Sequence, residues 1–430
     1  MRKARTNPLT LWPDEAYEQD VIRQGVLWRP RLLVSRPDVV QRVFVTNTAN
    51  YRKTPTPLRL LRPMTGNGLL MSDGDEWKMQ RRIVAPALAA GTMPLHVRHV
   101  AAGTLAALDR LRQAATAPVN LLAAAHLMTL DIAGRSMFSL DLLRHGETIR
   151  NAMSRYARKH GRPDLLDMLL PLSVPSPRDF GRRRFNREWM AVMDGIIAER
   201  RDAPPSDVPR DLYDLLVGAR DSETGQAFTP EQLRDQMVTL ILAGHDTTAA
   251  SLFWSLLMLA QAPVEQERVA QEARQLSFDA DAGMATVGAL EHTRAVVNET
   301  LRLYPAAYRL ARQAIGPDRV DDLDIPRGAI VVAAPWLLHR NRRRWPNPDA
   351  FDPARFLPGA PPPPRFAYLP FGIGPRVCVG AQLALTELTF ALGAIVREFH
   401  IERVDQRPVI PVGAVVIDPD HVPLFRLTPR

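Results

Sequence analysis

The sequence has very little cysteine: Cys378 is the single one in 430 residues. One cysteine cannot form an intrachain disulfide, so a disulfide-stabilised framework is excluded. The chain also shows no internal repeat of solenoid period, and no apolar segment follows its basic N-terminus. A repeat protein and a secretory signal peptide are therefore not predicted, and we expect a cytoplasmic protein.

An uninterrupted apolar run long enough to cross a bilayer is also missing. The most apolar segment, 237–259, is interrupted near its middle by His245, Asp246 and two threonines. Ionisable side chains are costly at the centre of a membrane. The segment therefore predicts a buried helix of a soluble protein without a membrane anchor.

The chain carries more positive than negative charge, with a formal net charge of +9. Such a balance attracts nucleic acid, anionic membrane or an acidic protein partner. Arginines cluster at 180–187 and 339–345, and a solvated face is the usual interpretation of such runs. Because no nucleic-acid-binding motif accompanies them, we expect no nucleic-acid partner.

The apolar patterning predicts a mainly α protein with a small β region, an α+β fold. Strand-like segments occur at about 25–50, 312–335 and 400–430, including 413–417, and helical periodicity occurs at about 75–305 and 380–399. A proline-rich, nearly helix-free stretch covers 340–370. Strands at both ends with helices between them predict one α-rich domain spanning residues 1–430, whose small sheet joins distant segments.

The lone cysteine lies in the stretch LPFGIGPRVCVG, residues 369–380, directly before a segment of helical periodicity. Free amides and the positive end of the helix dipole favour a thiolate at that position. Gly372, Gly374 and Gly380 let the backbone turn sharply and approach a flat ligand. The pattern favours a thiolate presented to a metal. An inert buried cysteine and a nucleophile remain alternatives.

Residues 371–380, FGIGPRVCVG, resemble the haem-binding loop of the cytochromes P450. The resemblance covers about residues 35–400 and implies the single, large, triangular-prism-like P450 domain. It also implies heme b (iron protoporphyrin IX), with Cys378 as the axial thiolate ligand of the iron. Thiolate ligation pushes electron density to the iron and favours O–O cleavage.

The central apolar segment has the start signals of a long helix. Thr229, Pro230 and Gln232 form a capping-box pattern, and the periodicity continues to Pro263. The polar stretch AGHDTT, 243–248, predicts a kink within this helix. It resembles the family's oxygen-activation motif, which implies that Asp246 and Thr247 deliver protons to bound oxygen. The family leaves the position of His245 variable, so no role is predicted for it.

Two further segments predict an ion network. Glu299 and Arg302 in ETLRLYP lie at i and i+3, hence on one helix face. The resemblance implies that Arg355 in FDPARF completes a structural network with both, because buried charges must be paired. It further implies that five residues contact the haem and its propionates: Trp77, Arg81, Arg312, His339 and Arg376.

The implied reaction is a haem-thiolate monooxygenation that hydroxylates or epoxidises a hydrophobic small molecule with O₂ and two electrons. The sequence has no flavin or nicotinamide motif, so the electrons would come from a ferredoxin and its NAD(P)H ferredoxin reductase. The net positive charge would favour an acidic partner. Arg365 and the arginines of 340–344 are candidates for the docking surface, and we expect a monomer.

The segments that would line the substrate pocket are mainly apolar, as suits a fatty acid, terpenoid or steroid. The candidate lining residues are Leu240, Ala243, Gly244, Ala307 and Val415. Two alternatives remain open at this point. One is a peroxide-using or isomerising haem-thiolate enzyme, and the other is a non-catalytic haem sensor, which would have no need of Asp246 and Thr247.

Overall fold

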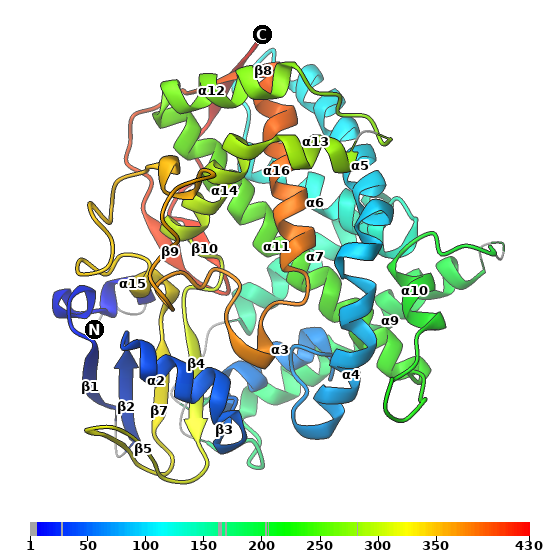
Figure 1. The fold of residues 1–430 in the computed structure, drawn as a ribbon. Helices are drawn as coiled ribbons and strands as arrows, with labels where there is room; N and C mark the ends of the chain where they lie inside the picture. Colours follow the sequence, from blue (N-terminus) through cyan, green and yellow to red (C-terminus); the bar gives the residue numbers. More distant parts are fainter. Residues whose placement is uncertain are drawn as a thin grey trace.

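The computed structural model describes residues 7–430 except 27–28, 162–165, 168–169, 203, 205 and 282. Helices fill most of the molecule, and the larger sheet lies at the lower left of Figure 1. The described α-helices are α2 (Pro37–Gln41), α3 (Pro55–Thr65), α4 (Gly74–Ala87), α5 (Met93–Ala114), α6 (Leu121–Phe138), α7 (Leu143–Lys159), α9 (Pro177–Arg201), α10 (Leu212–Gly218), α11 (Pro230–Gln261), α12 (Pro263–Arg274), α13 (Gly283–Ala289), α14 (Glu291–Leu303), α15 (Pro335–Leu338) and α16 (Ala381–Glu398).

The described strands form one larger sheet and three two-stranded ones. They are β1 (Val21–Val26), β2 (Arg29–Val34), β3 (Tyr51–Arg52), β4 (Leu310–Ala314), β5 (Asp318–Val320), β6 (Leu323–Ile325), β7 (Ile330–Ala333), β8 (Phe399–Arg403), β9 (Pro411–Gly413), β10 (Ile417–Pro419) and β11 (Phe425–Pro429). The larger sheet has the order β1-β2-β7-β4-β3, so N-terminal strands pair with strands from beyond residue 310.

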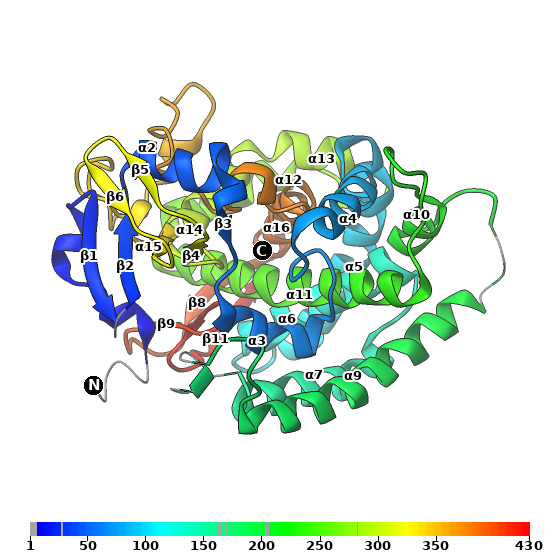
Figure 2. The same cartoon turned by 90° about the horizontal axis from the view of Figure 1, so that it is seen from below.

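The long helix α11 organises the helical part. Its predicted capping box is present, because the Thr229 hydroxyl accepts from the Gln232 amide and the Gln232 side chain accepts from the Thr229 amide. Every residue from Thr248 to Leu259 is buried, as expected of a helix enclosed on all sides. It packs against α6 and α16, and Figure 2 shows it crossing the middle of the molecule.

Two strand predictions are wrong in part. Residues 25–50 contain strand only as far as Val34, because Pro37 occupies the first turn of helix α2 and a short π-helix, Arg42–Thr46, follows. Residues 413–417 do not form one strand, since β9 ends at Gly413, residues 414–416 form a bend, and β10 starts at Ile417. The short β9–β10 hairpin replaces it.

Within the described residues, no single helix is long and apolar enough to span a membrane. The pair α11 and α12 meets the length and composition criterion only jointly, and the two helices are bent by 113° relative to each other.

Candidate active site

The cysteine loop is held by close backbone contacts that admit only glycine at one position. Gly374 has a φ of +71°, and a Cβ added there would lie 2.0 Å from the carbonyl oxygen of Phe44. The amide of Cys378 donates to the carbonyl of Phe371 at 2.9 Å. The loop is thereby folded back on itself directly before α16, which begins at Ala381.

The Cys378 side chain is exposed, yet protein surrounds it. Burial is the largest influence on its pKa and raises it, while a backbone hydrogen bond from Gly380 and the charge of Arg81 lower it. The loop therefore presents an accessible sulfur atom directly before the N-terminus of α16.

Among the described residues, the cations near this loop outnumber the anions. Burial and the charge of Arg376 lower the pKa of Arg312 to about 10, and burial with Arg376 lowers the pKa of Lys53 to about 7. Asp73 is the carboxylate facing this group, paired with Arg376 and 3.9 Å from the Lys53 Nζ. One carboxylate against three partly buried cations leaves room for further negative charge.

Helix α4 contributes two of the predicted haem contacts, Trp77 and Arg81, near the cysteine loop. Arg81 donates from Nη1 to the carbonyl of Val377 at 2.7 Å, next to the cysteine. The guanidinium of Arg376 lies 4.2 Å from the ring centroid of Trp77. The structure thus brings Trp77, Arg81 and Arg376 together, with Arg312 close enough to repel Arg376.

These residues fit haem. The accessible sulfur suits an iron ligand, and the unbalanced cations suit the two propionates, which are carboxylates that require forked donors when buried. Lys53 was not predicted, because one lysine in NYRKTPT carries no motif. It reaches the site because β3 pairs with β4, with Tyr51 opposite Ala314.

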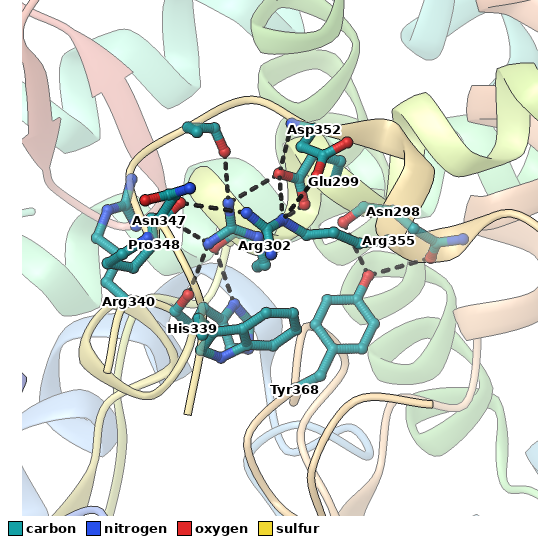
Figure 3. A network of polar contacts seen from close by, with 12 residues as sticks. Asn298, Glu299, Arg302, His339, Arg340, Asn347, Pro348, Asp352, Arg355 and Tyr368 are labelled. Carbon is teal, nitrogen blue, oxygen red and sulfur yellow. Dashed lines mark hydrogen bonds and ion pairs between the residues drawn. The ribbon is translucent and has the colours of Figure 1, made fainter. Parts of the chain in front are cut away.

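The predicted ion network is present and fully buried at its centre (Figure 3). Arg302 binds both carboxylate oxygens of Glu299, at 2.7 and 2.8 Å, and Arg355 approaches the same carboxylate at 3.5 Å. The remaining donors of Arg302 go to the carbonyls of His339, Pro348 and Ala350. All five N–H groups of Arg302 therefore have an acceptor.

The predicted propionate contact of His339 does not fit the structure. Its Nε2 accepts from the amide of Leu369 at 2.7 Å, and its Nδ1 lies 3.0 Å from the carbonyl of Arg302. Both ring nitrogens are thus used by backbone groups, and the side chain is completely buried. His339 belongs to the ion network, and the propionate assignment is corrected accordingly.

Helix α11 continues without interruption through 243–248, where the sequence predicted a kink. The hydroxyl of Thr247 donates to the carbonyl of Ala243 at 2.5 Å. Asp246 has a carboxyl that is one-third exposed, but burial and the nearby Asp418 raise its pKa to about 7. A carboxyl with this pKa exchanges protons readily near neutral pH.

The five predicted pocket residues differ in exposure. Ala243, Ala307 and Val415 are exposed, Gly244 is partly exposed, and Leu240 is buried. A Cβ added at Gly244 would meet only the terminal methyl of Met137, at 3.8 Å. The exposed Ala243 and partly exposed Gly244 give α11 an open side, as a ligand pocket requires. Leu240 contributes little surface to this side, because it is buried.

Comparison with known proteins agrees with this arrangement. Residues 15–421 match the family model described as Cytochrome P450. Cyclooctatin synthase of Streptomyces melanosporofaciens is 29% identical over 390 residues, which cover 89% of this chain and 83% of the relative. Cyclooctat-9-en-7-ol 5-monooxygenase of the same organism is 29% identical over 351 residues, 80% of this chain and 74% of the relative.

A solved structure has the same fold. The cytochrome P450DA heme domain superposes with a TM-score of 0.83 at 24% identity, covering 96% of this chain and 90% of that one. Fold and family together define a haem-thiolate class of oxidative enzyme. The chain belongs to the cytochrome P450 family, and it is a monooxygenase.

Proposed function

We propose that Cys378 is the axial ligand of heme b in an enzyme that hydroxylates or epoxidises a hydrophobic small molecule. The observation that carries this proposal is the exposed Cys378 side chain, which lies next to the amide of Gly380 and the charge of Arg81. When bound, the haem supplies the activation of O₂. Every other step depends on the protein's own residues.

Arg312, Arg376 and Lys53 would hold the propionates. The pKa of each is lowered by burial and by repulsion from neighbouring cations. A carboxylate bound between them would reduce this repulsion and favour the charged form of all three. Arg81 and Trp77 would line the same side of the cofactor site, and Arg81 donates a hydrogen bond to the carbonyl of Val377. This charge arrangement would orient the cofactor and keep it in place.

Asp246 and Thr247 would deliver the protons that oxygen reduction consumes. The Asp246 carboxyl, with a pKa of about 7, both holds and releases a proton at neutral pH. The Thr247 hydroxyl is anchored on the Ala243 carbonyl, which fixes the position of its oxygen on this face of α11. Substrate would lie against the same face, beside Ala243, Gly244, Ala307 and Val415.

Electrons would come from a ferredoxin and its NAD(P)H-dependent reductase. The docking surface proposed from the sequence needs revision, because Arg340 is buried against the Trp336 ring. Arg342 pairs with Asp14 and Glu18, and Arg344 pairs with Asp20. Arg343 and Arg365, which are exposed, are the better candidates.

The test is the carbon monoxide difference spectrum of the dithionite-reduced protein. We expect the strongly red-shifted Soret band of a thiolate-ligated haem in the wild type and its loss in Cys378→His. An ordinary haem–CO band in the wild type would contradict thiolate ligation. An isomerising enzyme or a sensor would give the same red-shifted band but form no product with O₂ and a reduced ferredoxin.

A further inference from the structure

Beside the proton-delivering residues, the structure holds a cluster of three potential metal ligands. His126 of α6 and His245 and Asp246 of α11 place their ligand atoms within 4.8 Å of one another. The His126 Nδ1 lies 3.8 Å, and the His245 Nε2 3.7 Å, from Oδ1 of Asp246. These distances exceed a hydrogen bond, so the three groups converge without bonding one another.

Thr129 fixes which nitrogen of His245 faces the cluster. Its hydroxyl lies 2.9 Å from Nδ1 of His245 and 3.2 Å from the carbonyl oxygen of the same residue. The hydroxyl also lies 3.3 Å from the carbonyl oxygen of His126. When the hydroxyl donates to either carbonyl, it accepts from the N–H at Nδ1, and in that tautomer the lone pair of His245 lies on Nε2, which faces Asp246.

This orientation is the one that a metal site requires. A ligating histidine donates its second ring N–H to an outer partner, which holds the ring in place. The His245 side chain is only 8% exposed, and within the described part of the chain its Nε2 forms no hydrogen bond. A buried imidazole lone pair facing a carboxylate oxygen calls for a cation between them.

The dimensions suit a zinc-type ion. Around a tetrahedral ion with bonds of about 2.0–2.1 Å, neighbouring ligand atoms lie about 3.3 Å apart. The observed distances are 3.7 and 3.8 Å to the carboxylate oxygen and at most 4.8 Å between the histidine nitrogens, so the side chains must rotate inward to close around an ion. His126 and Asp246 are each about one-third exposed, so an ion can enter, and the partly buried Asp418 is a further carboxyl close enough to influence Asp246.

We propose that His126, His245 and Asp246 form a binding site for a divalent transition metal of the zinc type, with its fourth position open to water. Its consequence for activity rests on the proposed function: a metal on Asp246 would block the proton donor and make the site inhibitory. The binding itself does not depend on the haem chemistry.

The test is a calorimetric titration with zinc chloride of the haem-loaded enzyme, from which all metal ions other than the haem iron have been removed. We expect one saturable site per chain, weakened at least about tenfold in His126→Ala. Thr129→Val, which removes no ligand, is expected to weaken binding by about tenfold. His145→Ala is the matched control, because His145 pairs with one carboxylate, Glu199, at 3.2 Å on the surface.

Two results would overturn the site: no saturable binding in the wild type, or equal binding in the wild type and His126→Ala. The carbon monoxide spectrum of the same samples tests the proposed function separately. If zinc binds through His126 while the red-shifted band is missing, the metal site stands and the haem-thiolate function fails. If the wild type both binds zinc and shows the red-shifted band, zinc should slow NAD(P)H oxidation in the wild type and not in His126→Ala.

Discussion

The Nε2 atom of His339 accepts a hydrogen bond from the backbone amide of Leu369 at 2.7 Å. Leu369 precedes Phe371, whose carbonyl accepts from the amide of Cys378. The buried ion network therefore reaches the cysteine loop through a neutral imidazole. Burial holds the pKa of His339 at about 3, which keeps Nε2 free to accept.

Replacing His339 by leucine should loosen the cysteine loop. The Leu369 amide and the Arg302 carbonyl would both lose their partners, at a cost of about 1–3 kcal/mol for each buried group left unpaired. We expect faster haem loss, measured as transfer to an excess of apomyoglobin. His400 in β8, whose side chain is 39% exposed, is replaced in the same way as the control. Equal transfer rates in both variants would contradict the link.

Arg302→Lys should destabilise the fold severely. Lysine has three donors on one nitrogen and cannot serve the five acceptors that Arg302 serves, and Glu299 would keep a poorly paired charge. We expect a loss of about 3–5 kcal/mol in the free energy of unfolding, measured by urea denaturation. Arg355→Lys should reduce the free energy of unfolding clearly less, because Arg355 is partly exposed and its contact with the Glu299 carboxylate is 3.5 Å long.

Arg312→Gln should have opposite effects with and without haem. In the apoprotein the change removes a buried cation that Arg376 repels, so the melting temperature should rise. In the haem-loaded protein it removes a partner of a propionate, so haem should dissociate faster. A change of the same sign in both forms would mean that Arg312 does not face the cofactor.

Glu387 should make stability depend on pH. Burial raises its pKa to about 8, and one of its carboxylate oxygens has no partner. The folded protein then binds more protons than the unfolded chain between about pH 4.5 and 8, so stability falls as pH rises through this window. Glu387→Gln should flatten that fall in thermal unfolding curves. Glu291→Gln, on the surface, should leave it unchanged.

Thr247→Ala should uncouple electron consumption from product formation. Without the hydroxyl that Ala243 anchors, protons would reach the reacting oxygen atoms in the wrong place, and two electrons and two protons would leave with O₂ as hydrogen peroxide. The measurements are NAD(P)H consumed, product formed and peroxide released, each per mole of enzyme. Thr247→Ser keeps the hydroxyl and should stay coupled, and full coupling in Thr247→Ala would disprove the proton-delivery role.

Local patterns predicted the parts of the site that lie within one segment. The Thr229 capping box, the Glu299 and Arg302 pair and the cysteine loop each need only a few neighbouring residues, and each appears as predicted. The polar stretch 243–248 did not interrupt α11, because tertiary packing around the helix outweighs the weak helix propensity of these residues.

Relations between distant segments were beyond prediction. The order of motifs suggested a propionate contact for His339, but its partner Leu369 lies 30 residues away in an irregular stretch. Lys53 enters the site only through strand pairing, and His126 meets Asp246 only because α6 packs on α11. β-branched Val415 and Val416 favoured a strand, whereas the chain turns there.

The pairing of β3 with β4 also has a consequence for how the protein is made. Arg52 and Gln313 are 261 residues apart in sequence, so Lys53 and Arg312 become neighbours only after most of the chain has been synthesised. Contacts of such long range form late and slowly in folding. Haem capture would then be a final step of maturation, because a nascent chain that ends before Cys378 lacks the sulfur ligand that we propose for the iron.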